Sequence, residues 1–556
     1  MKKLINDPGS VVPEMIQGLV ASRPGLSIVP GHAVVVRDDA DFAANRDRRV
    51  ALISGGGSGH EPAHAGYVGP GMLSAAVLGD VFTSPAPDAV LAAIRASAGA
   101  AGALLIVKNY TGDRLNFGLA AEMARAEGID VAMVIVADDV ALAGSTAETA
   151  GARGLAGTIL VHKVAGAAAE AGLSLAEVAA EARAAAEAVA TMGVALSSCT
   201  VPAAGKPGFT LGEDEVELGL GIHGEPGVRR IPLEPADALV DRLLGPILGK
   251  IPAGPVALMI NNLGGTPPME LSIVARYALA RLAAEGRIVE RSYVGTFLSA
   301  LEMAGVSLSA LALDDDRLAR LDAPTGAPAW PNAPARARST PPAPAEAAET
   351  AGRPTPATPA STEAGRSLGS ALQRAAHTLI DHADRLTDLD QKVGDGDLGI
   401  SLARGSRAVL EALPTWPLDD PAATLSALGT LLQRVLGGTS GPMYAMLAFR
   451  AASALRDDPA AWPDAFRDGV AGVIELGGAR AGDRTMLDAL IPASEALAEG
   501  RSLREAIEAA EAGAEATAAM MPRRGRSSYL GDRALGHPDP GAVAVALWLR
   551  AIGPDR

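Results

Sequence analysis

Three aspartates in the second half of the sequence are spaced so that they could bind a divalent cation. Asp390, Asp395 and Asp397 lie in the stretch DQKVGDGDLGIS, at the end of a segment with helical periodicity. Hard divalent cations prefer carboxylate oxygens, and carboxylates this close together repel one another unless a cation neutralises them. A calcium-binding EF-hand loop is disfavoured, because the residue after Gly399 is apolar and a terminal glutamate is missing. The motif therefore predicts a Mg²⁺ site.

The first half of the sequence contains polar stretches that could bind a small oxygen-rich molecule. They are residues 55–62 (GGGSGHEP), 108–117 (KNYTGDRLNF) and 218–227 (LGLGIHGEPG). His60 offers a titratable nitrogen, Asp113 could take a proton from a hydroxyl group, and Lys108 could neutralise charge. His223 has glycines nearby on both sides, so its imidazole could attack a carbonyl carbon and hold it as a hemiaminal. Taken singly, each stretch is also compatible with a turn or a structural histidine.

The elements that must position these side chains are short β-branched runs alternating with helical segments. We expect strands over residues 49–54, 103–107, 131–136 and 256–260, with a helical segment over residues 117–128. This order is typical of an α/β sheet domain, in which ligands bind at the carboxyl ends of strands. Residues 55–62 are expected to form a glycine-rich turn after the first of these strands.

A change in composition separates the two halves of the chain. Residues 331–366 are dense in Pro, Ala and Thr, which predicts an interdomain linker between a first domain over residues 1–330 and a second over residues 367–556. The second domain has long Ala/Leu/Glu-rich stretches with helical period and is expected to be all-helical. No GxxxxGK[ST] phosphate loop occurs, but the GGTSG stretch at residues 437–441 would supply backbone donors for an anion at a helix start.

The bulk properties narrow the class of protein. A chain of 556 residues is too long to fold around a single hydrophobic core, so two or three domains are expected. Its net charge of −16 argues against a nucleic-acid partner. The single cysteine, Cys199, and the lack of an apolar N-terminal segment predict a cytoplasmic protein, and no run of about 18 apolar residues suggests a membrane span.

The first domain resembles the substrate domain of the single-chain ATP-dependent dihydroxyacetone kinases. GGGSGHEP, KNYTGDRLNF and GLGIHGEPG carry the resemblance, with SCTVPAAGKP and NNLGGT as further matches. It implies two α/β subdomains, a hemiaminal between His223 and a ketone, Asp113 as the base on the attacking hydroxyl, and His60 as a hydrogen-bonding group that assists proton movement. The implied substrate contacts are Gly57, Ser58, Gly59, His60, Lys108 and Asp113.

The second domain resembles the nucleotide-binding domain of the same kinases. The aspartate loop carries this resemblance together with residues 437–442, 482–488, 525–529 and 536–541. It implies an eight-helix barrel that binds ATP and two Mg²⁺ ions on Asp390, Asp395 and Asp397. The implied nucleotide contacts are Leu398, Gly399, Ile400, Ser401, Thr439, Ser440, Met486, Arg526, Asp539, Pro540 and Gly541. Leu398 departs from the family pattern, where a polar residue is common, which affects nucleotide contacts rather than the metal triad.

The implied activity is ATP-dependent phosphorylation of dihydroxyacetone, a step in glycerol metabolism, by a chain whose domains close on each other within a homodimer. Erythrulose or glyceraldehyde are alternative substrates. A phosphotransferase-system kinase with ADP as fixed cofactor is a rival, although fusion of both domains favours direct use of ATP. A non-enzymatic sensor or transcriptional co-regulator is another rival, although retention of His223 and of the three aspartates favours catalysis. Formation of a cyclic nucleotide from FAD, as in some animal relatives, is untested by the sequence.

Overall fold

The computed structural model describes residues 2–141, 151–224, 227–331, 360–524 and 526–553. The chain divides into two compact units, and their boundary falls within residues 332–359, outside the described residues. Most of the expected linker over residues 331–366 therefore lies outside the description, but the first helix of the second unit already begins at Glu363. Among the described residues, no helix is long and apolar enough to cross a membrane.

The first sheet of the first unit has six strands in the order β1-β2-β4-β3-β5-β6. β3, β4, β5 and β6 are parallel, whereas β2 pairs antiparallel with both β1 and β4. The strands are β1 (Leu26–Ile28), β2 (Val34–Arg37), β3 (Ala51–Ser58), β4 (Ala75–Val81), β5 (Ala103–Lys108) and β6 (Val131–Val136). The strands expected over residues 103–107 and 131–136 are thus confirmed.

The glycine-rich turn expected at residues 55–62 is wrong in its first half. β3 continues to Ser58, and its glycines pair in parallel with β4, where Gly57 lies opposite Gly79. The reason is close packing: a Cβ atom on Gly57 would lie 2.6 Å from the carbonyl carbon of Phe82. Glycine is thus required here because the loop after β4 presses against the strand, and the chain leaves the sheet only at Gly59.

The second sheet of the first unit also has six strands, in the order β11-β10-β12-β7-β8-β9. Neighbouring strands in this sheet are antiparallel, except that β10 and β11 are parallel. The strands are β7 (Val189–Ala195), β8 (Glu215–Leu218), β9 (Arg229–Pro232), β10 (Val256–Asn262), β11 (Val289–Gly295) and β12 (Gly305–Ala312). The strand expected over residues 256–260 is β10, and the two sheets make this unit α/β throughout.

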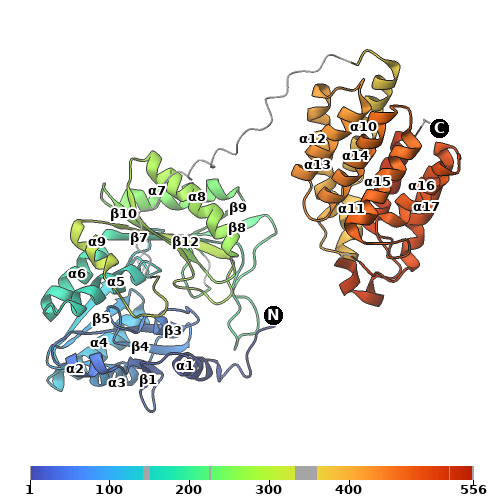
Figure 1. Cartoon of the computed structure of the whole chain (residues 1–556). Coiled ribbons are helices and arrows are strands. Elements are labelled where there is room, and N and C mark those ends of the chain that lie inside the picture. The colour runs from blue at the N-terminus through green and yellow to red at the C-terminus, as the bar shows by residue number, and fades with distance from the viewer. Residues whose placement is uncertain (1, 142–150, 225–226, 332–359, 525, 554–556) are drawn as a thin grey trace. The chain divides into compact units, whose positions relative to one another are not determined.

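Helices pack on both faces of the first sheet and on the second. The helices of this unit are α1 (Val11–Ala21), α2 (Ala40–Asn45), α3 (Pro87–Ser97), α4 (Thr111–Ala126), α5 (Thr158–Glu170), α6 (Leu175–Ala188), α7 (Ala236–Lys250), α8 (Pro268–Ala284) and α9 (Asp315–Asp322). One core lies between α3, α4 and the first sheet; a larger one includes α5, α6 and residues of both sheets. In Figure 1, α5 and α6 accordingly lie between the two sheets.

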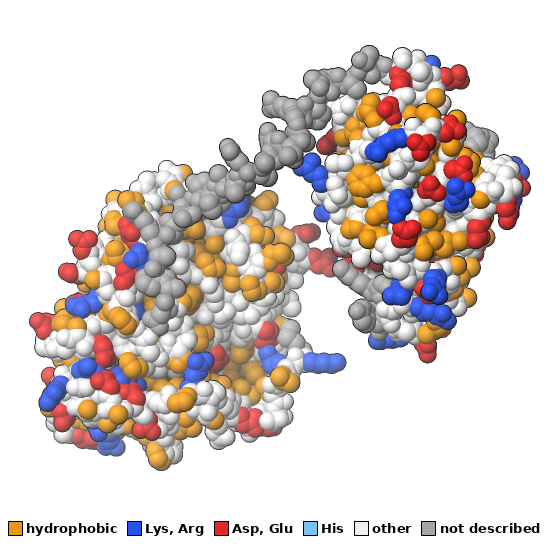
Figure 2. Space-filling view, viewed as in Figure 1, with side chains coloured by type: hydrophobic (Ala, Val, Ile, Leu, Met, Phe, Trp, Pro, Cys, Tyr) orange, Lys and Arg blue, Asp and Glu red, His pale blue; other side chains and the backbone are white. Residues whose placement is uncertain are grey.

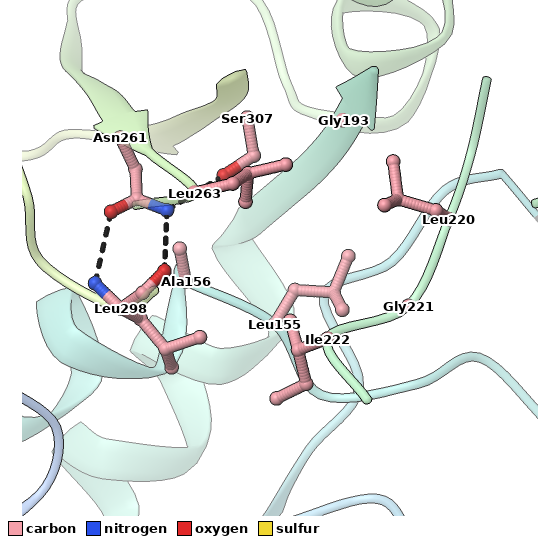
Figure 3. Close-up of a pocket in the computed structure, with 10 residues that line it drawn as sticks. All are labelled: Leu155, Ala156, Gly193, Leu220, Gly221, Ile222, Asn261, Leu263, Leu298 and Ser307. Carbon is pink, nitrogen blue, oxygen red and sulfur yellow. Dashed lines mark hydrogen bonds between the residues drawn. The ribbon is translucent and has the colours of Figure 1, made fainter. Parts of the chain in front are cut away.

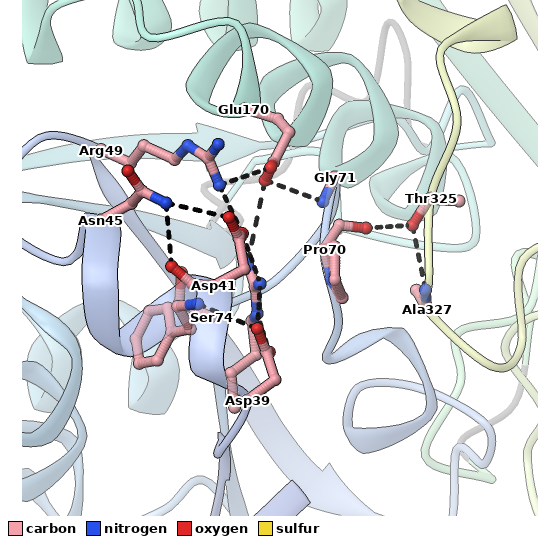
Figure 4. A network of polar contacts seen from close by, with 12 residues as sticks. Asp39, Asp41, Asn45, Arg49, Pro70, Gly71, Ser74, Glu170, Thr325 and Ala327 are labelled. Atoms are coloured by element: carbon pink, nitrogen blue, oxygen red, sulfur yellow. Dashed lines mark hydrogen bonds and ion pairs between the residues drawn. The ribbon is translucent and has the colours of Figure 1, made fainter. Parts of the chain in front are cut away.

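A network of ion pairs anchors the end of α5 to β2 and α2 (Figure 4). The buried Arg37 donates to Asp39 at 2.8 Å, and Arg49 lies 2.6 Å from both Asp41 and Glu170. Glu170, the last residue of α5, also accepts a hydrogen bond from the backbone N–H of Gly71. The network therefore fixes α5 over the sheet.

The second unit is helical, and residues 360–524 and 526–553 contain no strand. Its helices are α10 (Glu363–Asp381), α11 (Ala383–Val393), α12 (Leu398–Ala412), α13 (Pro421–Val435), α14 (Ser440–Asp457), α15 (Trp462–Gly477), α16 (Leu487–Ala498), α17 (Leu503–Ala516) and α18 (Pro540–Ile552). Successive helices from α12 to α18 pack against one another. On the face drawn in Figure 2, acidic and basic side chains are interspersed over both units.

Candidate functional site

His60 lies directly after β3 and is held in one tautomer by a loop of the second sheet. Its Nδ1 lies 2.8 Å from the carbonyl oxygen of Ser299, to which it can only donate, so Nε2 carries the lone pair. That Nε2 is buried without a hydrogen-bond partner among the described residues. Burial, then Lys108 and His223, lower the pKa of His60 well below its usual value. His60 is thus a neutral hydrogen-bond acceptor at Nε2.

Asn261 holds the loop that positions His60 (Figure 3). Its side chain accepts from the backbone N–H of Leu298 at 2.9 Å and donates to the Leu298 carbonyl at 2.8 Å and to Ser307 Oγ at 3.0 Å. Asn261 and Ser307 line a cavity of about 10 Å³, which the chain around Ile222 closes on its other side. Asn261 therefore holds the backbone of Leu298, next to Ser299, whose carbonyl oxygen contacts His60.

His223 is surrounded by aromatic rings from three other segments. Its ring centroid lies 4.6 Å from that of Tyr110, 5.0 Å from that of His60 and 5.5 Å from that of Phe82, all edge to face. Burial, then Lys108 and Arg153, lower the pKa of His223 to about 3. The imidazole is therefore neutral at physiological pH, which is the form that can act as a nucleophile.

Lys108 and Asp113 form a buried pair of opposite charge beside Gly56. Lys108 is the last residue of β5, and Asp113 lies in the first turn of α4. A Cβ atom on Gly56 would lie 3.0 Å from Lys108 Nζ and 3.6 Å from Asp113 Oδ2, so only glycine leaves room between them. Burial raises the pKa of Asp113, an effect that Lys108 and the hydrogen bond from Ser84 Oγ oppose. Burial likewise lowers the pKa of Lys108, and Asp113 opposes it.

The structure brings the predicted residues of the first domain together, but Ser58 has a structural contact. Ser58 Oγ donates to the carbonyl oxygen of Gly79 at 2.7 Å, which ties β3 to the loop after β4. Phe82, in that loop, was not singled out from the sequence, although its ring stacks on His60 at 5.1 Å and its φ is 60°. Only its folded position reveals it, because an aromatic residue after a strand has no distinctive spacing.

The three aspartates of the second unit converge at the start of α12. One carboxylate oxygen from each aspartate lies within 4.8 Å of those from the other two, close to the spacing of about 3 to 4 Å that oxygens bound to one Mg²⁺ adopt. Asp390, in the last turn of α11, is buried, and its Oδ2 accepts from the backbone N–H groups of Asp397 at 2.9 Å and Leu398 at 3.1 Å. Asp390 therefore orders the loop that presents the other two carboxylates. These residues fit a Mg²⁺ site.

The predicted nucleotide contacts lie at the starts of α12, α14, α16 and α18. Ser401, in the first turn of α12, accepts a hydrogen bond from the Gly437 N–H just before α14. A Cβ atom on Gly541, at the start of α18, would lie 3.6 Å from the Cβ of Met486, the N-cap of α16. Helix starts present unpaired N–H groups and positive potential, so they suit phosphate oxygens. The predicted residues in these first turns are Leu398, Gly399, Ile400, Ser401, Thr439, Ser440, Met486, Asp539, Pro540 and Gly541.

Arg484 and Asp488 were not singled out from the sequence, yet they organise these helix starts. The fully buried guanidinium of Arg484 donates to the carbonyls of Thr517, Ala534 and His537. Asp488 accepts from backbone N–H groups of the loop before α16. The sequence had indicated them only as part of the stretch GDRTMLD at residues 482–488, a candidate for nucleotide contact. Arg526 begins a 3₁₀ turn, but its side chain lies outside the described residues, as does Gly525.

Asp539 caps α18, and the pKa of its carboxyl group is raised. Its side chain accepts from the Ala542 N–H at 2.8 Å. Burial raises the pKa of Asp539 to about 6; the bond from Ala542 and the charge of Arg484 lower it, whereas Asp488 and Asp390 raise it. Asp390 and Asp539 are thus electrostatic neighbours, which places the metal triad and the start of α18 at the same end of the helical unit.

Fold and sites together define a two-domain protein with a buried polar pocket in one domain and a candidate metal site in the other. A Dak1 domain model matches residues 17–329 and a DAK2 domain model matches residues 392–553. The chain therefore belongs to the dihydroxyacetone kinase family in which these two domains are fused.

Known proteins resemble the chain over almost its full length. It is 46% identical to the triokinase/FMN cyclase of Homo sapiens, covering 99% of this chain and 98% of that protein, and 37% identical to the L-erythrulose 1-kinase of Mycolicibacterium smegmatis, covering 100% and 99%. The crystal structure of the dihydroxyacetone kinase from C. freundii in complex with AMP-PNP and Mg²⁺ is 39% identical, with a TM-score of 0.63 and coverage of 99% of both chains.

Proposed function

We propose that this protein transfers the γ-phosphoryl group of ATP to a hydroxyl group of a small hydroxyketone, with dihydroxyacetone as the first candidate. The observation that carries the proposal is the presence of both sites in one chain: the pocket of His60, Lys108, Asp113 and His223, and the three-aspartate cluster. A sensor or co-regulator would need neither the nucleophile nor the metal ligands. The solved relative with AMP-PNP and Mg²⁺ supports ATP and Mg²⁺ as cosubstrate and cofactor.

In the pocket, neutral His223 would attack the ketone carbonyl carbon and hold the substrate as a hemiaminal: the C=O double bond becomes a C–O single bond, and its oxygen takes the proton that the imidazole loses. The lone pair of His60 Nε2 accepts from a hydroxyl of the bound substrate, and Lys108 stabilises negative charge that develops there. Asp113 would then take the proton from the attacking hydroxyl, since Ser84 orients its carboxylate and Lys108 opposes the rise in its pKa that burial causes. Gly57, Ser58 and Gly59 would contact the substrate through their backbone.

In the helical domain, Asp390, Asp395 and Asp397 would bind two Mg²⁺ ions, which neutralise charge on the nucleotide phosphates. The starts of α12, α14, α16 and α18 would bind the nucleotide, with Arg526 as a further contact. We also propose that this domain is an eight-helix barrel. Its support is a closed ring of contacts, in which each helix from α12 to α18 packs on the next and α10 packs on both α18 and α12.

The domain boundaries at residues 330 and 367, the homodimer and the cytoplasmic location stay predictions. Size-exclusion chromatography with light scattering would test the dimer, because a monomer at micromolar concentration would contradict it.

The substrate can be identified by comparing several small carbonyl compounds. The L-erythrulose 1-kinase relative favours a four-carbon ketone as the second candidate after dihydroxyacetone. The test is Mg²⁺-dependent ADP formation with dihydroxyacetone, D- and L-erythrulose, glyceraldehyde and glycerol. We expect turnover with carbonyl substrates and none with glycerol, which has no carbonyl for His223 to capture. Absence of turnover with every carbonyl substrate would contradict the proposal. Turnover only with a phosphohistidine donor protein in place of ATP would indicate a phosphotransferase-system enzyme.

A further inference from the structure

Two buried histidines outside the pocket, His64 and His162, both contact the hydroxyl group of Ser54. Ser54 Oγ lies 3.1 Å from His162 Nε2 and 3.5 Å from His64 Nδ1. The centroids of the two imidazole rings are 5.2 Å apart, and their side chains are almost completely inaccessible. Buried polar groups of this kind usually have a partner for every polar atom, so their remaining nitrogens need an explanation.

The hydrogen bonds of Ser54 determine which nitrogen of each imidazole carries the proton. Ser54 Oγ has one hydrogen, which it donates to the carbonyl oxygen of Ile106 at 2.7 Å, so toward both histidines it can only accept. Burial, then Lys108, lower the pKa of both histidines, to about 3 for His162, so both rings are neutral. The protons therefore lie on His162 Nε2 and His64 Nδ1. Lone pairs remain on His162 Nδ1 and His64 Nε2, which have no hydrogen-bond partner among the described residues.

The pleat of the sheet places Lys108 on the same face as Ser54, the residue that both histidines contact. Ser54 of β3 lies opposite Ile106 of β5, and side chains two residues apart on a strand point to the same face. Lys108 therefore shares the face of Ser54 and Ile106, and its Nζ lies close to Gly56 on that face. Ile106 packs in one core with apolar residues of α5, the helix that carries His162. The ion-pair network at the end of α5 fixes that helix over the same face.

The ammonium group of Lys108 lacks hydrogen-bond acceptors among the described residues, and the two histidines have acceptor nitrogens that are not used there. This ammonium group has three donors, is fully buried, and has no hydrogen-bond partner among the described residues. A buried ammonium without acceptors is strongly unfavourable. We propose that Ser54, His64 and His162 are positioning residues for Lys108: the lone pairs of His64 Nε2 and His162 Nδ1 accept hydrogen bonds from its ammonium through a bridging water, and hold it opposite Asp113.

Other groups also face Lys108, and their effects differ from that of the two histidines. Asp113 on α4 and Asp138 after β6 favour the ammonium form through their charge. His60 and His223, on the substrate side, are neutral and repel no charge. Acceptance by His64 and His162 adds a directional bond to the charged form, so losing it lowers the pKa of Lys108. The inference rests on the proposed function only in that Lys108 serves the substrate.

The test replaces each histidine with Asn or Gln, whose side-chain amide reproduces the hydrogen-bonding position of one imidazole nitrogen and not of the other. At position 64, His64→Asn keeps the δ donor to Ser54 and loses the ε acceptor, whereas His64→Gln keeps the ε acceptor. At position 162 the pattern inverts, because His162→Gln keeps the ε donor and loses the δ acceptor, whereas His162→Asn keeps the acceptor. The matched control is His377→Asn, an exposed histidine of α10.

The first readout is the pH profile of kcat/KM for the full chain with its ketone substrate. We expect the alkaline limb to move down by about one pH unit in His64→Asn and His162→Gln, because a hydrogen bond to a charged group is lost. It should stay within about 0.3 unit of wild type in His64→Gln, His162→Asn and the control. A merely structural role would not produce this inverted pattern. Equal shifts for Asn and Gln at both positions, or none, would overturn the proposal.

The second readout is independent of turnover. The chain has seven lysines, so protein labelled with ¹³C at the lysine Cε gives few signals, and Lys108→Arg identifies the one that belongs to Lys108. Its titration should show the same lowered pKa in His64→Asn and His162→Gln. If wild type turned over no ketone, the proposed function would fail while this titration still decided the inference. An unchanged Lys108 pKa in all four folded variants would overturn it.

Discussion

Asp113 in the sheet domain and Asp390 in the helical domain are both buried carboxylates, yet their surroundings differ in kind. Asp113 faces the ammonium of Lys108 and one hydroxyl group, within a pocket of neutral histidines. Asp390 faces two backbone N–H groups at a helix start and two further carboxylates that are exposed. The first site neutralises charge with its own side chain, whereas the second leaves a net negative charge that suits an added cation.

The difference indicates a division of work between the two domains. A pocket that is internally neutral can exclude water and bind an uncharged ketone, and its catalytic groups are ready in the absence of a ligand. A cluster of exposed carboxylates is completed only when Mg²⁺ and nucleotide bind. Substitutions in the sheet domain should therefore act on the ketone, and those in the helical domain on the metal and nucleotide.

The largest expected effect is that of His223→Ala. Loss of the nucleophile should lower kcat/KM for dihydroxyacetone by about 10⁴-fold, because the substrate loses its covalent anchor and its orientation. Binding of AMP-PNP with Mg²⁺, measured by calorimetry, should be unchanged. His32→Ala, in the turn between β1 and β2, is the control and should keep wild-type turnover. Undiminished turnover in His223→Ala would refute covalent capture.

Asp113→Asn should separate chemistry from binding. The amide can still accept from Ser84 but cannot take a proton, so kcat should fall by about 10³-fold while KM changes less than about threefold. Asp88→Asn, an exposed residue of α3, is the matched control. In wild type, kcat should decline on the acid side as Asp113 becomes protonated, at a pH raised by burial and lowered by Lys108. A kcat for Asp113→Asn within tenfold of wild type would identify another group as the base.

Asp390→Asn tests the candidate metal site of the helical domain. The amide oxygen can still accept from the two N–H groups, but the charge is lost, so the Mg²⁺ concentration needed for half-maximal turnover should rise by about 10²-fold. Asp388→Asn changes an exposed carboxylate on the same helix and should leave that concentration unaltered. Affinity for dihydroxyacetone should be unchanged in both. A ketone-binding defect in Asp390→Asn would contradict the division between the domains.

The smallest effect concerns stability at Asp539, whose carboxyl pKa of about 6 lies above its usual value of 3.8. Ionisation therefore destabilises the folded domain, a penalty that is absent below about pH 4, grows between pH 4 and 6, and is complete above pH 6. Asp539→Asn removes the charge and keeps a cap on α18. It should raise the free energy of unfolding by about 1 kcal/mol at pH 7.5 and by much less at pH 4, as measured by urea denaturation.

Asp420→Asn is the control for that experiment. Asp420 caps α13 with the same geometry, accepting from the Ala423 N–H at 2.9 Å, but it is exposed. Its replacement should change the free energy of unfolding by less than about 0.5 kcal/mol at either pH. An equal gain in both variants would show that the effect arises from capping rather than from the buried charge.

The sequence by itself determined the strands over residues 103–107, 131–136 and 256–260, the change from an α/β domain to a helical one, and the clustering of Asp390, Asp395 and Asp397. These features depend on neighbours in the chain: hydrophobic periodicity marks each element, and three carboxylates within eight residues stay close in any compact loop. The predicted positions of Lys108 and Asp113, at the end of a strand and the start of the next helix, follow for the same reason.

Only the tertiary structure decided which partners surround those residues. The glycines after β3 were expected to form a turn, but the approach of the loop after β4 keeps them in the strand. Phe82 and Ser299 reach His60 from distant segments, and Ser54 meets His64 and His162 only because α5 packs over β3. Such contacts depend on how the elements pack, since a local pattern records the face of an element but not what lies against it.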